Sequence, residues 1–576
     1  MNANPPGSER TSHQDASRPI DELSDAYVET YARLHPIAAT FDGIAGHDHE
    51  LTDYSPDGAA ERADHDRATL RALGSVPIET DADRVAAGVI RERLEVAVEL
   101  HDRGEHLRSI AVLGSAVQEV REAFDMLATD TEADWETVAS RMARVPECVA
   151  SLEAAFTEGR RRGLVASNRQ VTGAIAQVEV WAGLDADATP PYFHELAGRL
   201  GASGVGPASL HATVTREAER ATAALASFAR YLTLEYAIDA DPRDAVGEER
   251  YAIGARVFNG TVLDLQETYD WGWEELRRIE HAVGQVASRI LPNASVGEVV
   301  ELLETDPARA IEGEDNLRAW LQDLMDRTIA EMNGVHFDIP EPVKTVEAMI
   351  APPGGASAMY YTGPSEDFSR PGRTWYPTMG NTRFPLWGEV SICYHEGVPG
   401  HHLQVAQVRY LADTLTRFQR TLAWSSGHGE GWALYAERLM GELGYLDNPD
   451  YELGMLRAQA MRAVRVIVDI GMHLELPIPA DESYHPGERW TPELALPFVI
   501  QRAMFAEQFM RSEVDRYLGI PGQAISYKVG ERVWLESRAD AKARHGADFD
   551  LKAWHSHALD LGSMGLDQFR AEMARY

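Results

Sequence analysis

Residues 394–404, with the sequence YHEGVPGHHLQ, constrain the fold more than any other part of the chain, because they place three histidines and one glutamate within eight positions. In an ordinary His-Glu-x-x-His helix, the two imidazoles are four positions apart and therefore share one helix face. Here the fourth residue after His395 is Pro399, and the next histidines are His401 and His402. On a straight helix neither could share a metal with His395, since His401 would point to roughly the opposite face and His402 would lie about 10.5 Å along the axis.

Pro399 and Gly400 indicate how the chain resolves this conflict. Proline has no N–H and its ring interrupts the helical hydrogen bonds, while glycine permits an unusual backbone turn. We therefore expect a bulged helix in which two extra residues bring His401 to the place of a fourth-position ligand. His402 would then contact a ligand or the substrate. A bulge with three extra residues would exchange the two roles, and the spacing alone leaves this alternative open.

A second motif completes a candidate metal site. Zinc in hydrolases is held by imidazole nitrogens at ~2.0–2.1 Å and by a carboxylate, with one position left for water. Glu430, in the motif GEGWALYAE, is the best candidate for the carboxylate, because the 28 residues between His401 and Glu430 let the chain turn and return antiparallel. Glu437, two turns further on the same face, is expected to hydrogen-bond a ligating imidazole. Glu396, next to the first histidine, is placed to reach the water as a general base.

The remainder of the chain predicts a mainly α-helical protein with more than one packed unit. Its 576 residues exceed the ~250–300 at which one hydrophobic core stops growing. Residues 1–19 are rich in Asn, Pro, Ser and Gly, and we expect a disordered leader there. Residues 20–345 have helical periodicity and are expected to form a scaffold and one wall of a cleft. Residues 346–576 are expected to form the catalytic region.

A small β insert is predicted at the start of that catalytic region. Residues 346–390 are rich in Pro, Gly and aromatic side chains, which is typical of short strands and turns. Residues 354–361, Tyr360 among them, are expected to form the other wall of the cleft, where an extended substrate could add as a strand. Helical periodicity returns after Glu389, and we expect the metal-binding and C-terminal helices there.

Composition excludes several classes of function. Against 54 Lys and Arg stand 91 Asp and Glu, so the formal net charge is -37 and repels both phosphate backbones and anionic lipid. No stretch approaches the ~18–20 apolar residues that cross a bilayer, so neither a nucleic acid nor a membrane is an expected partner. The only cysteines are Cys148 and Cys393, which favours a reducing cytoplasm. Neither a Gly-x-Ser-x-Gly elbow nor a P-loop lysine is present.

Four motifs together resemble a known family. HEGVPGHHLQ, EGWALYAE, PGQAISYKVG and FDLKAWHSHALDLGS are similar to the bacterial family of unknown function numbered 885. That family is similar in turn to the helical gluzincin metallopeptidases, which include thermostable carboxypeptidases, thimet-type oligopeptidases and angiotensin-converting enzyme. The resemblance implies a large helical gluzincin-like fold with one zinc ion held by His395, His401 and Glu430, and with Glu396 as general base. Tyr527 would match the tyrosine that such peptidases direct at the tetrahedral oxyanion.

The sequence therefore predicts a zinc-dependent hydrolase that cleaves peptide or peptide-like amide bonds of short substrates. Water activated by the metal would attack the carbonyl, and Glu396 would pass a proton to the leaving amine. One alternative is a small-molecule amide hydrolase with the same mechanism. Another is a non-catalytic helical scaffold that binds peptides and keeps a structural metal, which would be closed by four protein ligands. The choice of substrate, of exo- or endo-cleavage, of native metal and of oligomeric state is left open.

Overall fold

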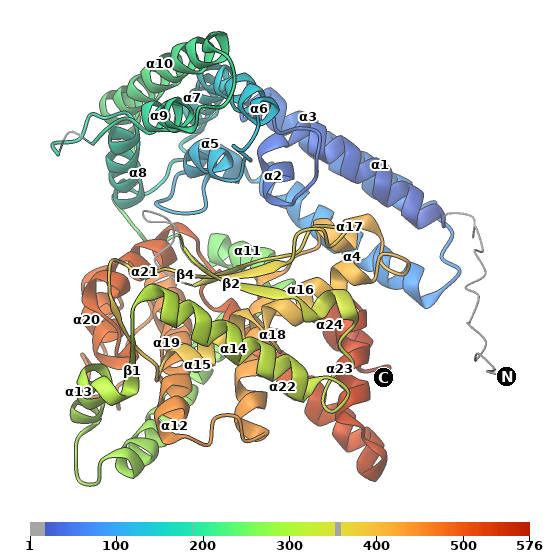
Figure 1. The fold of residues 1–576 in the computed structure, drawn as a ribbon, viewed down its shortest axis with the longest axis vertical. Helices are drawn as coiled ribbons and strands as arrows, with labels where there is room; N and C mark the ends of the chain where they lie inside the picture. Colours follow the sequence, from blue (N-terminus) through green and yellow to red (C-terminus); the bar gives the residue numbers. More distant parts are fainter. Residues whose placement is uncertain (1–17, 188, 352–358) are drawn as a thin grey trace.

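The computed structural model describes residues 18–187, 189–351 and 359–576, and these residues are mainly α-helical with two small sheets (Figure 1). The predicted mainly α fold is thus confirmed. Residues 1–17 of the predicted leader and residues 352–358 of the predicted insert, including Gly354, lie outside the described residues.

The helices fall into three groups along the chain. The first group is α1 (Pro19–Leu34), α2 (Pro36–Phe41), α3 (Pro56–Leu73), α4 (Asp81–Asp102) and the 3-10 turn η1 (Glu105–Arg108). The second is α5 (Ala116–Asp125), α6 (Glu132–Met142), α7 (Val145–Arg162), α8 (Asn168–Trp181), α9 (Tyr192–Ser203) and α10 (Ala208–Tyr231), which continues as a π turn η2 (Leu232–Tyr236).

The third group contains the candidate site. Before the strands it comprises α11 (Glu248–Asn259), α12 (Leu265–Ile290), α13 (Val296–Thr305), η3 (Pro307–Arg309), α14 (Glu314–Met332) and η4 (Glu341–Lys344). After them come α15 (Glu389–Glu396), α16 (His401–Tyr410), α17 (Arg417–Thr421), α18 (Ser426–Glu442), α19 (Pro449–Leu474), α20 (Pro492–Ala503), α21 (Glu507–Gly519), α22 (Ser526–His545), η5 (Gly546–Asp548), α23 (Leu551–Asp560) and α24 (Leu566–Met573).

Two separate apolar cores hold these helices together. The second group packs around its own core, which includes Phe156, Phe228 and Tyr236. α1, α3 and α4 instead share the main core with the third group. Figure 1 shows the α5–α10 lobe above the larger body. The division between cores therefore does not coincide with the predicted domain boundary at residue 345, because residues 251–343 pack with the catalytic region.

The strands form the predicted insert together with one strand from outside it. β2 (Val346–Ile350) pairs in parallel with β4 (Gly372–Tyr376), and β3 (Tyr360–Thr362) pairs antiparallel with the other side of β4, so that β3 lies at an edge. β5 (Arg383–Pro385) pairs antiparallel with β1 (Ala310–Glu312), which precedes the insert. Figure 1 shows β2 and β4 between the α5–α10 lobe and the helices of the third group.

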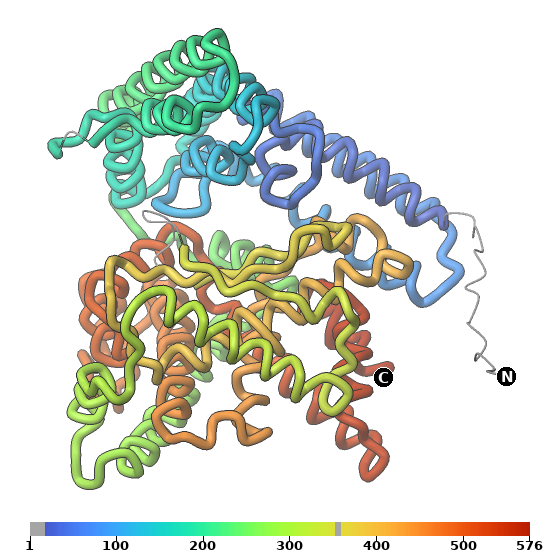
Figure 2. Tube along the Cα trace, in the orientation of Figure 1, coloured from blue at the N-terminus to red at the C-terminus, as the bar shows by residue number. Residues whose placement is uncertain are grey.

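The beginning and the end of the folded chain are joined. Nη1 and Nη2 of Arg84 on α4 both bind Glu572 on α24, and Gln568 donates to the carbonyl of Val85 at 2.9 Å. In Figure 2 the blue first helices and the red C-terminal end of the tube lie on the same side of the molecule. The first helices thus close the main core that contains the candidate site.

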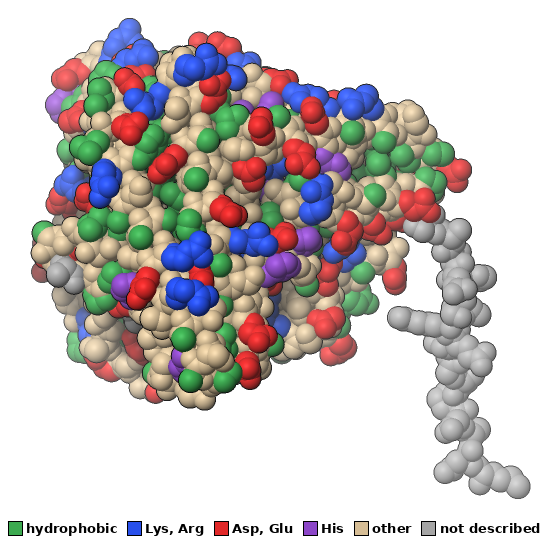
Figure 3. Space-filling model, turned by 90° about the horizontal axis from the view of Figure 1, so that it is seen from above, with side chains coloured by type: hydrophobic (Ala, Val, Ile, Leu, Met, Phe, Trp, Pro, Cys, Tyr) green, Lys and Arg blue, Asp and Glu red, His purple; other side chains and the backbone are tan. Residues whose placement is uncertain are grey.

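The molecular surface carries both signs of charge. Figure 3 shows acidic and basic side chains interspersed over one face. None of the helices in the described ranges combines the length and the apolar character needed to cross a bilayer.

Candidate metal centre

The predicted metal-binding segment is divided between two helices. α15 ends at Glu396 and α16 begins at His401, with a tight turn over residues 397–400 that contains a cis Val398–Pro399 peptide bond. The prediction of one bulged helix is therefore wrong, since the helix is interrupted. Pro399 cannot donate the hydrogen bond that a continuous helix would require at this point.

Gly400 allows this turn to fold back onto α15. Its N–H donates to the carbonyl of Tyr394 at 3.0 Å. A Cβ atom on Gly400 would lie 2.0 Å from the carbonyl oxygen of His395, so a larger residue would clash. His401 follows directly, and its ring centroid lies 4.8 Å from that of His395. The close turn explains why two extra residues still leave the two imidazoles side by side.

The three predicted metal ligands meet at one place. The Nε2 atoms of His395 and His401 each lie 3.4 Å from Oε2 of Glu430, which is supplied by α18. One ligand atom from each residue lies within 4.8 Å of the other two. Both histidines are buried and Glu430 is half-buried. The structure thus brings together the residues that the sequence singles out as a metal-binding set.

Glu437 holds the first imidazole in place. Its Oε1 lies 2.8 Å from Nδ1 of His395, and its Oε2 accepts a hydrogen bond of 2.5 Å from the hydroxyl of Ser391. The contact at Nδ1 leaves Nε2 of His395 directed toward Glu430. Burial would raise the pKa of Glu437, but Arg462 and His395 lower it overall. Glu437 therefore occupies the supporting position that the sequence predicts.

The charges at this place favour a cation. Burial would lower the pKa of His395, but the carboxylates of Glu430 and Glu437 outweigh burial and raise it to about 9. Burial would likewise raise the pKa of Glu430, but His401 and His395 lower it. Oε2 of Glu430 is buried and accepts no hydrogen bond from any described residue. A positive charge between the three side chains would therefore be stabilised.

His402 points away from the three ligands. It is fully buried, with Nδ1 2.9 Å from the hydroxyl of Tyr361 and Nε2 2.7 Å from the carbonyl oxygen of Val343. Burial lowers its pKa to about 4, so the imidazole is neutral. Because Tyr361 lines the cavity described next, His402 reaches that cavity only through Tyr361.

A cavity of about 510 Å³ opens beside the three ligands. Glu396 lines it, and burial raises the pKa of this carboxylate despite the nearby imidazoles, so its affinity for a proton increases. Tyr527 also lines it, and burial together with the charge of Glu430 raises the pKa of the phenol. Tyr360 lies in the lining too, with its ring stacked on that of Trp375. The cavity thus gathers a carboxyl group and a phenol whose pKa values are raised, together with the three candidate ligands.

The walls of this cavity differ in part from the predicted ones. Met359, Tyr360, Tyr361 and Gly363 of the insert line it, as the sequence predicts for that side. In the part of the chain that the structure describes, every other lining residue lies between 392 and 527. Residues 20–345, which the sequence predicts as the opposite wall, thus contribute no described side chain to this lining.

α22 positions Tyr527 by packing very closely against α18. A Cβ atom on Gly431 would lie 2.4 Å from the backbone carbon of Gly530, so only glycines allow this approach. The neighbour of Tyr527, Lys528, is fully buried, and its ammonium binds Gln459 at 2.8 Å and Glu275 at 2.7 Å.

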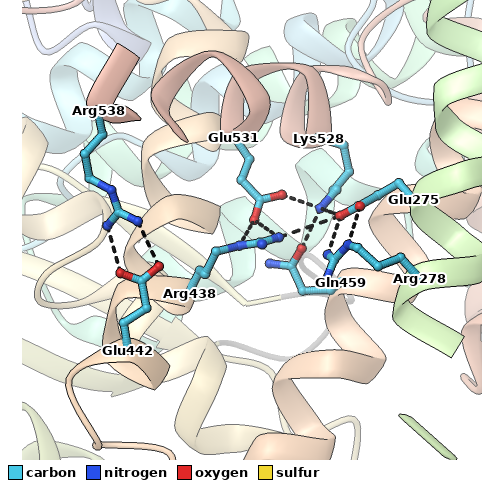
Figure 4. A network of polar contacts seen from close by, with 8 residues as sticks. All are labelled: Glu275, Arg278, Arg438, Glu442, Gln459, Lys528, Glu531 and Arg538. Atoms are coloured by element: carbon cyan, nitrogen blue, oxygen red, sulfur yellow. Dashed lines mark hydrogen bonds and ion pairs between the residues drawn. The ribbon is translucent and has the colours of Figure 1, made fainter. Parts of the chain in front are cut away.

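The ammonium of Lys528 belongs to a larger network, which Figure 4 shows at close range. It also binds Glu531, which accepts from Arg438 at 2.8 Å. Arg278 binds Glu275, and Arg538 binds Glu442. The network ties α12, α18, α19 and α22 together, and Lys528 within it follows Tyr527 directly in the chain.

Sequence reasoning missed two arginines in the cavity. Arg462 and Arg465 of α19 line it together with Phe505 and Phe509. The available signal is their place in the run AMRAVRVIV, where two charges three residues apart interrupt an otherwise apolar stretch. A buried charge requires a partner, so charges within such a helix indicate a specific polar site.

Comparison with known proteins places this chain in a family. The family described as "Bacterial protein of unknown function (DUF885)" matches residues 36–573, nearly the whole chain. The chain belongs to this family. No curated protein matches the sequence of this DUF885 member.

Two solved structures share the fold of this DUF885 member. One, from Colwellia psychrerythraea, is 21% identical with a TM-score of 0.83, over 97% of this chain and 99% of that one. The other, from Shewanella oneidensis, is 18% identical with a TM-score of 0.73, over 97% of this chain and 100% of that one. Each is described as a "putative lipoprotein", the second as of unknown function. At these identities the likeness concerns the fold alone.

Proposed function

We propose that this protein is a metal-dependent hydrolase that cleaves peptide bonds, or peptide-like amide bonds, in short substrates. The observation that carries the proposal is the convergence of His395, His401 and Glu430 on one point at the wall of a cavity that Glu396 also lines. We further propose that the arrangement is gluzincin-like, because the ligands come from a His-Glu motif and from a glutamate on a later helix.

The donor set suits a zinc ion. Two imidazole nitrogens and one carboxylate oxygen are typical of hydrolytic zinc sites, whereas structural sites are closed by four protein ligands. The buried Oε2 of Glu430, which faces both imidazoles and has no hydrogen bond within the described ranges, is the acceptor that such an ion would satisfy. The adjoining cavity leaves room for water and substrate, which favours a catalytic site over a structural one.

A bound zinc ion would supply a water of lowered pKa and would polarise the amide carbonyl. Glu396 would take the proton of the attacking water and give it to the leaving nitrogen. Glu437 would keep His395 in the tautomer whose Nε2 is free to ligate. Tyr527, protonated because its pKa is raised, would donate a hydrogen bond to the developing oxyanion.

The cavity suits a short, extended substrate. β3 lies at the edge of its sheet, and its residues Tyr360 and Tyr361 line the cavity. A peptide could therefore pair with this edge while its carbonyl faces the ligands. A volume of about 510 Å³ admits a short peptide or a small amide, so both substrate classes belong in the test.

The test combines metal analysis with digestion. We expect about one metal ion per purified chain, cleavage of members of a short-peptide library, loss of cleavage with a chelator and recovery when zinc is returned. Cleavage of small amides but not of peptides would favour the small-molecule alternative. Bound metal without cleavage of either class would contradict catalysis and would favour a peptide-binding scaffold with a structural metal.

We also propose a cytoplasmic location, because Cys148 and Cys393 are free and buried. The description of the two solved structures as lipoproteins suggests the cell envelope as the alternative. Fractionation of cells that express the full-length gene, followed by immunodetection, distinguishes the two locations.

A further inference from the structure

Arg462 and Arg465 lie one turn apart on α19, and both face the cavity of the candidate metal centre. Their side chains are only 8% and 6% exposed. Removing a guanidinium from water is costly unless hydrogen bonds and opposite charges replace its hydration. Any donor of these two arginines that has no partner in the protein therefore indicates what a ligand of the site would supply.

Arg465 shares its carboxylate partner, Glu513, with a second arginine. Its Nε and Nη2 donate to Oε2 of Glu513 at 3.1 and 2.6 Å, and Nε also donates to the hydroxyl of Tyr517 at 3.1 Å. Arg516 binds both oxygens of the same Glu513 at 3.0 and 2.9 Å. Nη1 of Arg465 makes no hydrogen bond with any described residue, and the guanidinium lies 4.5 Å from the ring centroid of Tyr527. Arg465 thus presents a free donor edge beside Tyr527.

Arg462 is even less fully paired. Its Nη2 lies 3.4 Å from Oε1 of Glu437, a carboxylate that already binds His395 and Ser391. Its Nε is buried and has no hydrogen-bond partner among the residues that the structure describes. Arg462 is therefore a buried cation with unused donors on the wall of the cavity.

We propose that Arg462 and Arg465 bind a free carboxylate group of the substrate, an inference that rests on the proposed hydrolase function. Two adjacent guanidinium groups with unused donors match the planar oxygens of a carboxylate. Phe505 and Phe509 line the same cavity and provide apolar surface for a neighbouring side chain.

The size of the cavity restricts where this carboxylate lies in the substrate. The arginines, Glu396 and the three ligands share one volume of about 510 Å³. A carboxylate bound at the arginines therefore belongs to the residue that adjoins the cleaved amide. The substrate class is short peptides or acylated amino acids with a free terminal α-carboxylate, cleaved at their last amide bond.

Matched ligands test the inference. N-acetyl-alanyl-phenylalanine, its C-terminal amide, and an N-acetyl-alanyl-aspartic acid α-amide that carries its carboxylate on the side chain are compared by kcat/KM on the zinc-loaded full chain. We expect the free acid to exceed its amide by about 10- to 100-fold, the range expected of charge-assisted hydrogen bonds. Preference for the side-chain carboxylate over the terminal one would overturn the assignment to a terminal carboxylate.

Binding is measured separately from turnover. Calorimetric titration of the Glu396→Gln variant with the same ligands, before and after removal of metal, reports affinity without cleavage. Tighter binding of the acid that survives metal removal supports the arginine site. A preference that disappears with the metal would show that the carboxylate coordinates the ion instead and would overturn the proposal.

Arginine variants identify the responsible side chains. Arg465→Gln should reduce the ratio of kcat/KM for the acid to kcat/KM for the amide to about one. Arg465→Lys keeps the charge but not the forked donors of the guanidinium, and it should retain part of the preference. Arg462→Lys should likewise retain part. Arg502→Gln is the matched control, since Arg502 binds Glu280 beside a different cavity and should leave the preference intact. If Arg465→Gln does not fold, Arg465→Lys and the wild-type ligand comparison still decide the question.

The two proposals fail in different ways. Cleavage of acids and amides at equal rates would overturn the carboxylate site while leaving the hydrolase. Preferential binding of the acid without any cleavage would support the carboxylate site and contradict the hydrolase.

Discussion

α10 in the upper lobe (α5–α10) and α19 in the larger body below it are helices of nearly equal length that differ in burial. Of the 24 residues of α10, 9 are buried, and they recur every three or four positions, whereas 19 of the 26 residues of α19 are buried. An amphipathic helix covers one side of a core, while a helix buried all round lies within it. The polar groups of α10 are therefore mostly solvated, and those of α19 have to find partners inside the protein.

Three buried polar residues of α19 lie at or near the candidate site. Arg462 and Arg465 line the cavity, and Gln459 binds the buried ammonium of Lys528. The one buried charge of α10, Glu217, pairs with Arg216 and Arg220 of its own helix. We infer that polar changes beside the cavity alter metal binding and turnover, whereas changes in the upper lobe alter stability. The following predictions test this difference.

The largest effect is expected at the proposed metal ligands. His401→Ala should reduce the metal content of the purified chain from about one ion to near zero and abolish turnover, because Nε2 of His401 is one of the converging atoms. His402→Ala should keep the metal, since His402 binds Tyr361 and Val343 instead. Elemental analysis of both variants decides the matter. If His402→Ala empties the site and His401→Ala does not, the ligand assignment is reversed.

The next effect concerns two buried carboxylates, one from each region. Glu396→Gln should lower kcat by about 10²- to 10⁴-fold, the usual contribution of a general base, while metal content stays unchanged. Glu119→Gln is the matched control, because Glu119 in the upper lobe also has a pKa raised by burial but is bound to Tyr54. It should leave kcat intact. Equal turnover of Glu396→Gln and wild type would remove the general base from the proposal.

Part of the fold and of the candidate site could be predicted from the sequence. Periodicity predicts helices over 211–236, 262–290 and 316–332, and the structure has α10 with η2, α12 and α14 there. These segments were predictable because one face of each is apolar and the other polar. The meeting of His395, His401 and Glu430 was predictable as well, since the two motifs that carry these residues are local features of the sequence.

Features that depend on distant packing could not be predicted. The interruption between α15 and α16 was missed for a different reason, since it depends on the backbone path of a local turn, in which the carbonyl groups of Tyr394 and His395 exclude any side chain at position 400. The second core and the lining of the cavity depend on which helices meet, and sequence periodicity does not specify this. For the same reason the sequence does not predict that Arg462 and Arg465 face the cavity, although it shows that they lie in an apolar run.

A core substitution in the upper lobe should separate stability from function. Phe156 is fully buried and packs against Phe228 and Tyr236. Phe156→Ala should lower the free energy of unfolding of this lobe by about 3–5 kcal/mol, with metal content and kcat retained below the new transition temperature. Hydrogen exchange resolved by mass spectrometry should show faster exchange in α7 and α10 and little change in α18. Equal acceleration in α18 would mean that the two cores unfold as one.

The smallest effect tests α19 itself through pH. His473 is fully buried, with Nε2 3.0 Å from the carbonyl oxygen of Tyr517, and burial lowers its pKa to about 4. In the unfolded chain the imidazole takes up a proton with a pKa of about 6.5. The stabilisation that neutral His473 contributes to the folded state is therefore fully present above pH about 6.5 and is lost as the pH falls from about 6.5 toward 4. Between pH 8 and pH 5 the loss amounts to about 2 kcal/mol.

His473→Gln removes this titration while keeping a side-chain N–H for the carbonyl of Tyr517. Denaturant unfolding at each pH should show that the variant loses about 2 kcal/mol less than wild type between pH 8 and pH 5. His485→Gln, in an exposed loop, is the control and should follow the wild-type curve. If wild type and His473→Gln lose the same stability between pH 8 and pH 5, His473 takes up its proton in the folded state as readily as in the unfolded chain. The buried polar groups of α19 would then be less isolated from solvent than the comparison with α10 implies.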